Sequence, residues 1–86
     1  MKSKEFIEQN QANQRDLGQR IIGLRKNADN MTRETLSELS KIPLDTLIKI
    51  ERGGQMTAVD KLKRIANFFG VSVDSLLIGM TFKFAA

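Results

Sequence analysis

The residues of this chain best suited to chemistry are its arginines and lysines, whose cationic side chains bind phosphate groups. The sequence contains 14 basic and 10 acidic residues, for a net charge of +4. The basic excess is concentrated in residues 15–27 and 57–70, and it consists of Arg15, Arg20, Arg25, Lys26, Lys61, Lys63 and Arg64. This distribution is typical of a surface that faces nucleic-acid phosphates, and a solvated surface of mild charge is the alternative interpretation.

The chain lacks the residue types that most often carry out catalysis or bind metal ions. The chain has no cysteine and no histidine, so it lacks thiolate ligands, imidazole ligands and the commonest general base. A carboxylate enzyme is the remaining catalytic hypothesis, but no pair of acidic residues has a convincing spacing. No apolar run approaches the roughly 18 residues of a membrane span, and the polar N-terminus has no signal-peptide segment. We therefore expect a cytoplasmic protein that is not an enzyme, with no cofactor and no metal.

Hydrophobic periodicity predicts the elements that position these side chains. Leu17, Ile21, Leu24 and Ala28 recur at intervals of three and four residues, which indicates a first helix. Asn13 is the predicted N-cap of this helix, with Asp16 in its first turn. We expect 14–79 to form one domain, 1–13 to form a polar arm or helical extension, and 80–86 to form a tail.

Two short helices follow, joined by residues 40–42. Thr32 is the predicted N-cap of the first, and Pro43 suits the first turn of the second because its φ is fixed near the helical value. The second of these helices spans 43–52 and ends at the glycine pair 53–54. The positions predicted to face the core are Leu36, Leu39, Leu47 and Ile50.

A fourth and a fifth helix complete the predicted fold. Thr57 is expected to cap the fourth helix, with Asp60 at capping-box spacing, and Gly70 to end it. Ser72 is expected to cap the fifth. The predicted buried face of the fourth helix comprises Val59, Leu62, Ile65, Ala66 and Phe69. In the tail, apolar residues alternate with polar ones, which favours a short strand. The predicted fold class is all-α, a compact five-helix bundle with an optional C-terminal strand.

Two short helices joined by a three-residue turn form a geometry that presents one helix outward. The major groove of B-DNA, about 12 Å wide, admits one such helix. Periodicity alone leaves an ordinary helical bundle open as the alternative.

Three segments carry a family resemblance. LGQRIIGLRK (17–26), TRETLSELSKIPLDTLIKIERG (32–53) and KLKRIANFFGVSVDSLLIG (61–79) resemble the XRE family of lambda-repressor-like and Cro-like helix-turn-helix regulators. The combination of IERG at 50–53 with GVSVDSLL at 70–77 is more specific than either motif alone. The resemblance implies a five-helix domain that binds double-stranded DNA.

The resemblance also implies roles for individual residues. Arg33 matches the position at which the family usually has a glutamine that braces the recognition helix and reaches the DNA. Arg25 and Glu51 match a structural ion pair between the first and third helices. The implied base-facing residues are Leu44, Asp45, Thr46 and Lys49, and the implied phosphate contacts are Thr32, Arg52 and the turn 53–55, including Gln55.

The chain departs from the family pattern at several positions. Lys41 replaces the turn glycine, and a left-handed conformation there would cost about 1–2 kcal/mol. Ser37 replaces an alanine, and the loop between the first two helices has one extra residue. Asp45 repels phosphates but can accept a hydrogen bond from the cytosine N4 amino group. Leu44 and Ile48 form an apolar strip that is either packed in the core or exposed to thymine methyl groups or a protein partner.

The resulting functional hypothesis is a nucleoid-associated transcriptional repressor that binds a palindromic operator as a homodimer. Dimerisation is expected to use the fifth helix and the tail, through Leu77, Met80, Phe82 and Phe84. The alternative is a protein-interaction module, or an antitoxin that uses the same fold to bind a toxin or another protein antagonist. Affinity that falls steeply with salt distinguishes DNA binding from apolar docking.

Overall fold

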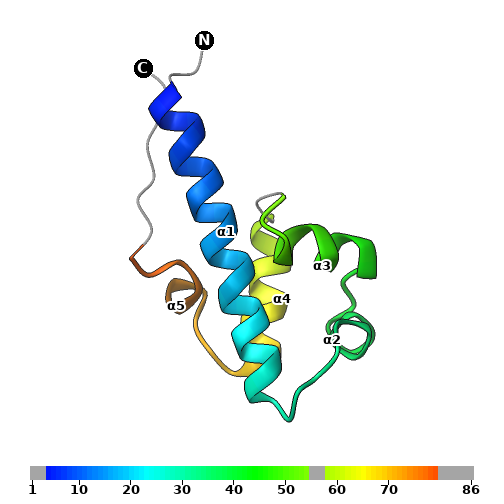
Figure 1. The fold of residues 1–86 in the computed structure, drawn as a ribbon. Coiled ribbons are helices and arrows are strands. Elements are labelled where there is room, and N and C mark those ends of the chain that lie inside the picture. The colour runs from blue at the N-terminus through cyan, green and yellow to red at the C-terminus, as the bar shows by residue number, and fades with distance from the viewer. Residues whose placement is uncertain (1–3, 55–57, 80–86) are drawn as a thin grey trace.

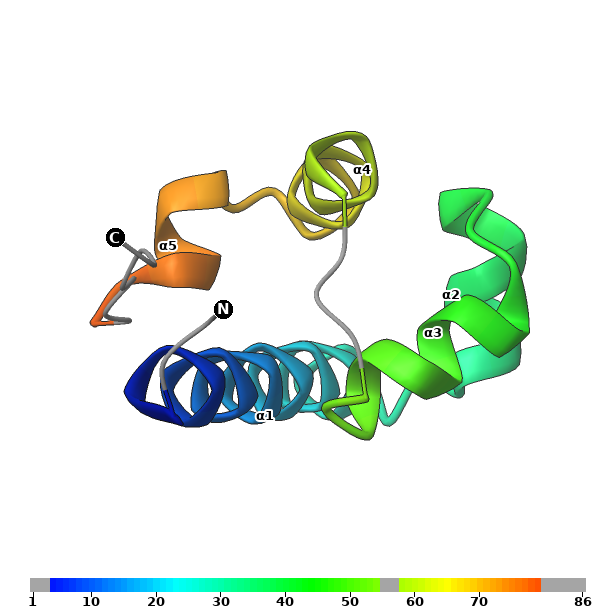
Figure 2. The same ribbon diagram turned by 90° about the horizontal axis from the view of Figure 1, so that it is seen from above.

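The computed structural model describes residues 4–54 and 58–79, which form five α-helices and, within these ranges, no strand (Figure 1). The helices are α1 (Lys4–Asn27), α2 (Arg33–Ser40), α3 (Leu44–Glu51), α4 (Val59–Phe69) and α5 (Val73–Leu77). The α2–α3 pair and α5 lie at opposite ends of the bundle, and α4 lies across from α1 (Figure 2). This arrangement confirms the predicted all-α five-helix fold. The predicted strand falls within 80–86, outside the described residues.

One apolar core receives side chains from all of these helices. Its members are each at most 5% exposed, and they are Leu17, Ile21, Leu36, Ile42, Leu47, Ile50, Leu62, Ile65, Ala66 and Leu76. Burying an aliphatic side chain of this size contributes about 1.5–3 kcal/mol, so the shared core is the main stabilising term for these short helices. Among the described residues, no helix has the length and apolar character needed to cross a lipid bilayer.

Several predicted helix boundaries are confirmed. The Thr32 hydroxyl accepts a hydrogen bond from the Thr35 amide at the start of α2, and Ser72 caps α5 in the same way. Gly70 ends α4 in the left-handed conformation, with φ of 69°. Pro43 is the N-cap of α3, so the helix itself begins one residue later than predicted. Ala58 occupies the N-cap position of α4, and Thr57 lies outside the described residues.

The prediction that Asn13 caps the first helix is wrong. Helix α1 begins at Lys4, and Asn13 lies in its interior, 1% exposed. Residues 4–13 contain no glycine or proline to stop the helix, so it continues through an asparagine that would favour a cap in isolation. Of the two forms considered for residues 1–13, the described part from Lys4 is a helical extension.

Two residues predicted to face the core are exposed instead. Leu39 is 54% exposed. The buried side of the short helix α2 is formed by Leu36 and Ser40, and Leu39 points away from it toward solvent. Val59 is 63% exposed because it is the first residue of α4, one turn before the buried Leu62.

Helices α1 and α3 approach one another so closely that their crossing point requires glycine. A Cβ atom added to Gly18 would lie 2.6 Å from the carbonyl oxygens of both Ile50 and Glu51. These obstacles are backbone atoms, which cannot rotate away. Gly23, one and a half turns further along α1, has nothing within 4 Å of the corresponding position. The α1–α3 crossing therefore fixes the position of α3.

The turn between α2 and α3 contains the predicted left-handed lysine. Lys41 has φ of 65° and ψ of 29°, and its amide donates a hydrogen bond to the Ser37 carbonyl oxygen. The Ser37 hydroxyl in turn donates to the Ile42 carbonyl oxygen at 2.6 Å, and Arg64 Nη1 donates to the Lys41 carbonyl oxygen at 3.2 Å. The serine that replaces the family's alanine thus satisfies a carbonyl group of the turn.

We expect Gly18→Ala to lower the free energy of unfolding by about 1–3 kcal/mol, because the added methyl group forces α3 away from α1. Gly23→Ala is the matched control in the same helix, and it should raise stability by about 0.5–1 kcal/mol through helix propensity. Urea denaturation of both variants measures the two effects. Equal effects in the two variants would contradict the close α1–α3 crossing.

We expect Lys41→Gly to be more stable than Lys41→Ala by about 0.5–1 kcal/mol. Both changes remove the charge, but only glycine adopts the left-handed conformation without strain, and its greater freedom in the unfolded chain offsets part of the gain. Thermal and urea unfolding of the two variants provide the measurement. An alanine variant as stable as the glycine variant would show that this turn is not strained.

Candidate nucleic-acid interface

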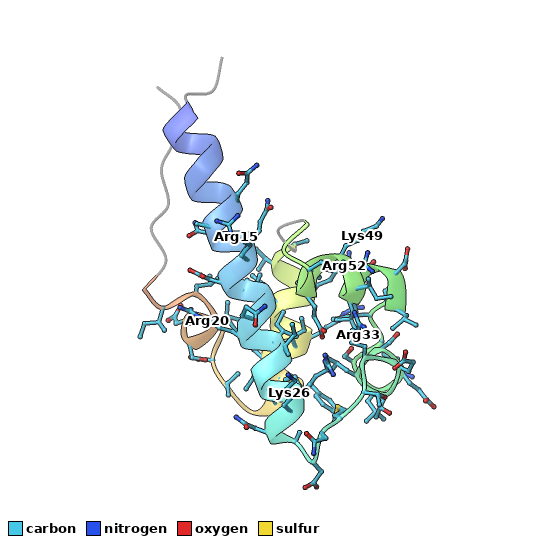
Figure 3. The ribbon with its side chains drawn as sticks, in the orientation of Figure 1. Arg15, Arg20, Lys26, Arg33, Lys49 and Arg52 are labelled. Atoms are coloured by element: carbon cyan, nitrogen blue, oxygen red, sulfur yellow. The ribbon has the colours of Figure 1, made fainter. Side chains whose placement is uncertain are left out.

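Helix α3 has two faces with different surroundings. Leu47, Ile50 and Glu51 are buried against the rest of the bundle, and Asp45 and Lys49 are exposed. Thr46 is half-buried between these faces, and Arg52, immediately after the helix, is exposed. Helix α3 is therefore anchored on one side and open to solvent on the other (Figure 3).

The exposed face of α3 offers both donors and acceptors at helical spacing. Asp45 and Lys49 are four residues apart and lie one above the other, so a carboxylate and an ammonium group share one face. Leu44 and Ile48 are half-buried, and they belong neither to the core nor to the partly buried residues that pack against it. The face can thus form hydrogen bonds to base edges and apolar contacts with methyl groups.

A buried carboxylate connects the three elements around this face. Glu51 has a side chain 2% exposed, and it accepts hydrogen bonds from Arg25 Nε and Nη2, each at 2.7 Å. Arg25 Nη1 also donates to the Met31 carbonyl oxygen at 2.7 Å, which holds the α1–α2 loop. This bidentate geometry is the strongest form of arginine–carboxylate pairing. The pair joins α1 to α3, as the family resemblance implies.

Arg33 contributes a second positive charge to the same carboxylate. Its Nε lies 3.8 Å from Oε1 of Glu51, and its side chain is 39% exposed. Because Arg25 already neutralises Glu51, Arg33 leaves the cluster with an excess positive charge at the N-terminus of α2. The resemblance implies that Arg33 braces the third helix, but Glu51 was not predicted as its partner, since the spacing of residues 33 and 51 gives no signal until α2 and α3 are packed together.

The N-terminus of α2 lies beside Arg33. Thr32 is exposed, but its hydroxyl already caps the helix and also donates to the Thr35 hydroxyl at 3.0 Å. A hydrogen bond from the Thr32 hydroxyl to a phosphate would therefore use a group that already caps α2.

The basic residues predicted on the first helix divide between two roles. Arg25 binds Glu51, and Arg20 Nη1 donates to the Leu76 carbonyl oxygen of α5 at 2.9 Å, so both hold helices together. Arg15 and Lys26 are exposed at different parts of α1, with Arg15 toward α3 and Lys26 near the far end (Figure 3). On α4, Lys63 and Arg64 are exposed and Lys61 is half-buried. The basic excess is therefore partly a structural feature and only partly a free surface.

The remaining predicted residues lie at or beyond the limits of the described chain. Leu77 is half-buried and packs against the core. Gln55, Met80, Phe82 and Phe84 lie outside the described residues. Among the residues that are described, no group of three or more acidic side chains could hold a metal ion.

We expect Glu51→Gln to lower the free energy of unfolding by about 3–5 kcal/mol, because it leaves the buried Arg25 charge without its partner. Arg33→Gln is the matched comparison, since it removes a charge from the exposed side of the same cluster, and its effect should stay below about 1 kcal/mol. Chemical denaturation compares the two. If both variants lose the same small amount of stability, the pair between Arg25 and Glu51 does not anchor α3.

The comparisons with known proteins agree with this geometry. A family model described as "Helix-turn-helix" matches residues 21–76, which include α2, α3 and the ion pair between Arg25 and Glu51. No curated protein and no solved structure matches the chain significantly. The family match covers well over half of the chain, and the sequence motifs specify the branch to which it belongs. This chain is a member of the XRE-type, lambda-repressor-like helix-turn-helix family, and it is a DNA-binding regulator of that type.

Proposed function

We propose that this protein is a transcriptional repressor that binds a palindromic operator as a homodimer and acts on the nucleoid. The observation that carries the proposal is the division of α3 into a face locked to the bundle and a face open to solvent. A helix held in this way enters the major groove without losing contacts of its own core.

The chemistry of the open face suggests how a site would be recognised. Lys49 and Thr46 would donate hydrogen bonds to base edges, and Asp45 would accept one from a cytosine amino group. Leu44 would contact a thymine methyl group. Contacts to the backbone would come from Thr32, Arg33, Arg52 and Gln55. Such backbone contacts fix the orientation of the protein, and the base contacts supply specificity.

Dimerisation would double this surface. We assign the dimer contact to α5 and the tail, through Leu77, Met80, Phe82 and Phe84. Helix α5 lies at the end of the bundle opposite the α2–α3 pair, so a contact there leaves α3 uncovered (Figure 2). Two copies related by a twofold axis would place their α3 helices about one DNA turn apart, roughly 34 Å. Repression would then follow from occupancy where the operator overlaps a promoter.

A protein-interaction module, such as an antitoxin that binds a partner through α3, is the second candidate. The half-buried strip of Leu44 and Ile48 favours it, because these side chains lie outside the core. An apolar contact of this kind would depend little on salt.

Selection of bound duplexes from a random DNA pool tests the proposed function. We expect recovered sequences to contain an inverted repeat with half-sites one turn apart, and affinity for them to fall steeply between 50 and 200 mM salt, as about six to ten phosphate contacts require. Recovery of no preferred sequence, with duplexes unretained even at low salt, would overturn the proposal.

On the recovered duplex, we expect Lys49→Ala to weaken binding by about 1–3 kcal/mol while the melting temperature stays unchanged, because Lys49 is exposed. Lys26→Ala is the control, an exposed lysine on α1 that lies away from α3. Competition binding measures both affinities. A large fall in the melting temperature of Lys49→Ala, or equal losses of affinity in both variants, would contradict this role.

A further inference from the structure

The turn that follows α3 has no spare backbone donors in its described part. The amide of Arg52 donates to the Ile48 carbonyl oxygen at 3.0 Å, that of Gly53 to Ile50 at 3.0 Å, and that of Gly54 to Lys49 at 2.8 Å. These amide groups close the end of the helix, so they do not supply free hydrogen bonds to an anion. Within residues 52–54, the groups left to bind a phosphate are therefore side chains.

Arg15 of α1 is fixed next to this turn. Gly53 has φ of 76°, and a Cβ atom added to it would lie 2.9 Å from Cγ and 3.0 Å from Cα of Arg15. Such distances mean that the turn rests directly on α1 at residue 15. Since Cγ as well as Cα lies against Gly53, the Arg15 side chain leaves α1 on the side of the turn.

The charged end of Arg15 is available for binding. Arg15 is exposed, and within the described part of the chain its side chain makes neither an ion pair nor a hydrogen bond. This separates Arg15 from Arg20 and Arg25 on the same helix, whose guanidinium groups bind Leu76 and Glu51. In Figure 3, Arg52 and Lys49 lie along α3, and Arg15 lies on α1 at the same level of the bundle.

Neither carboxylate of α3 cancels these charges. Glu51 is buried and occupied by Arg25, and Asp45 lies at the opposite end of the helix. Asp16 follows Arg15 in α1, and successive residues on a helix point in directions about 100° apart. The end of α3 thus presents three cationic side chains, two from α3 and its turn and one from α1.

We propose that Arg15 is a DNA-backbone contact of this domain and that it binds, together with Arg52, the phosphates beside the turn at 52–54. This inference rests on the proposed DNA-binding function and adds α1 to the surface formed by α2, α3 and their turns. The contact is electrostatic, so Arg15 contributes affinity and orientation without selecting a base.

Three variants test the contact on the duplex recovered by selection. Arg15→Gln removes the charge, Arg15→Lys retains it, and Lys26→Gln removes an exposed charge from the distant part of the same helix. Fluorescence anisotropy with labelled duplex gives the affinity of each variant between 50 and 200 mM KCl, and thermal unfolding checks that the fold is intact. Arg15→Gln should unfold at the temperature of the unmodified protein, because Arg15 is exposed.

We expect the slope of log affinity against log salt to be shallower by about 0.9 per bound subunit for Arg15→Gln, which is the loss of one phosphate contact. The ratio of its affinity at 50 mM to its affinity at 200 mM KCl should be about threefold smaller, per subunit, than the same ratio for the unmodified protein. Arg15→Lys should restore the slope, and Lys26→Gln should leave it unchanged.

An unchanged slope for Arg15→Gln, while the unmodified protein binds its selected duplex tightly, overturns this inference and leaves the proposed function standing. Equal changes in Arg15→Gln and Lys26→Gln also overturn it, because they indicate a response to net charge alone. Failure of the unmodified protein to bind any duplex removes both the inference and the function on which it rests.

Discussion

The Glu51 carboxylate makes the interaction on which the rest of the structure depends, its ion pair with Arg25. It lies on the inner face of α3, where the desolvation of an unpaired charge would cost several kcal/mol, and Arg25 of α1 offsets this cost with two short hydrogen bonds. Seven residues before Arg25 on α1, Gly18 allows the backbones of α1 and α3 to touch at the Ile50 and Glu51 carbonyl groups. An ion pair and a glycine contact thus fix α3 against α1, and they leave its other face open.

This arrangement explains why a mildly basic protein need not use all of its basic residues for binding. Arg20 and Arg25 hold α5 and α3 to α1, whereas Arg15, Lys49 and Arg52 remain exposed around the end of α3. Arg33 takes part in both groups, since it lies near Glu51 and is still partly exposed. The charge available to a phosphate backbone is therefore smaller than the composition suggests, and part of it lies around α3.

Much of the fold was predictable, because helix periodicity and capping depend on neighbouring residues. The stripe of Leu17 and Ile21, the caps at Thr32 and Ser72, and the strained Lys41 turn are local features of this kind. The errors arise where tertiary structure decides. Asn13 has a strong preference for caps but lies inside a longer helix, and Leu39 misses the narrow side of α2 that faces the core.

The site was predictable in part for the same reason. The split of α3 into two faces follows from spacing, whereas the approach of Arg33 to Glu51 and of Arg15 to Gly53 joins residues distant in sequence.

The central claim, that α3 enters a DNA groove with its outer face, is tested most directly by backbone-amide NMR shifts during titration with the selected duplex. We expect the largest shifts at Asp45, Thr46 and Lys49 and in the turn at 52–54. Shifts confined to α4 and α5, with α3 unaffected in a bound complex, would contradict it.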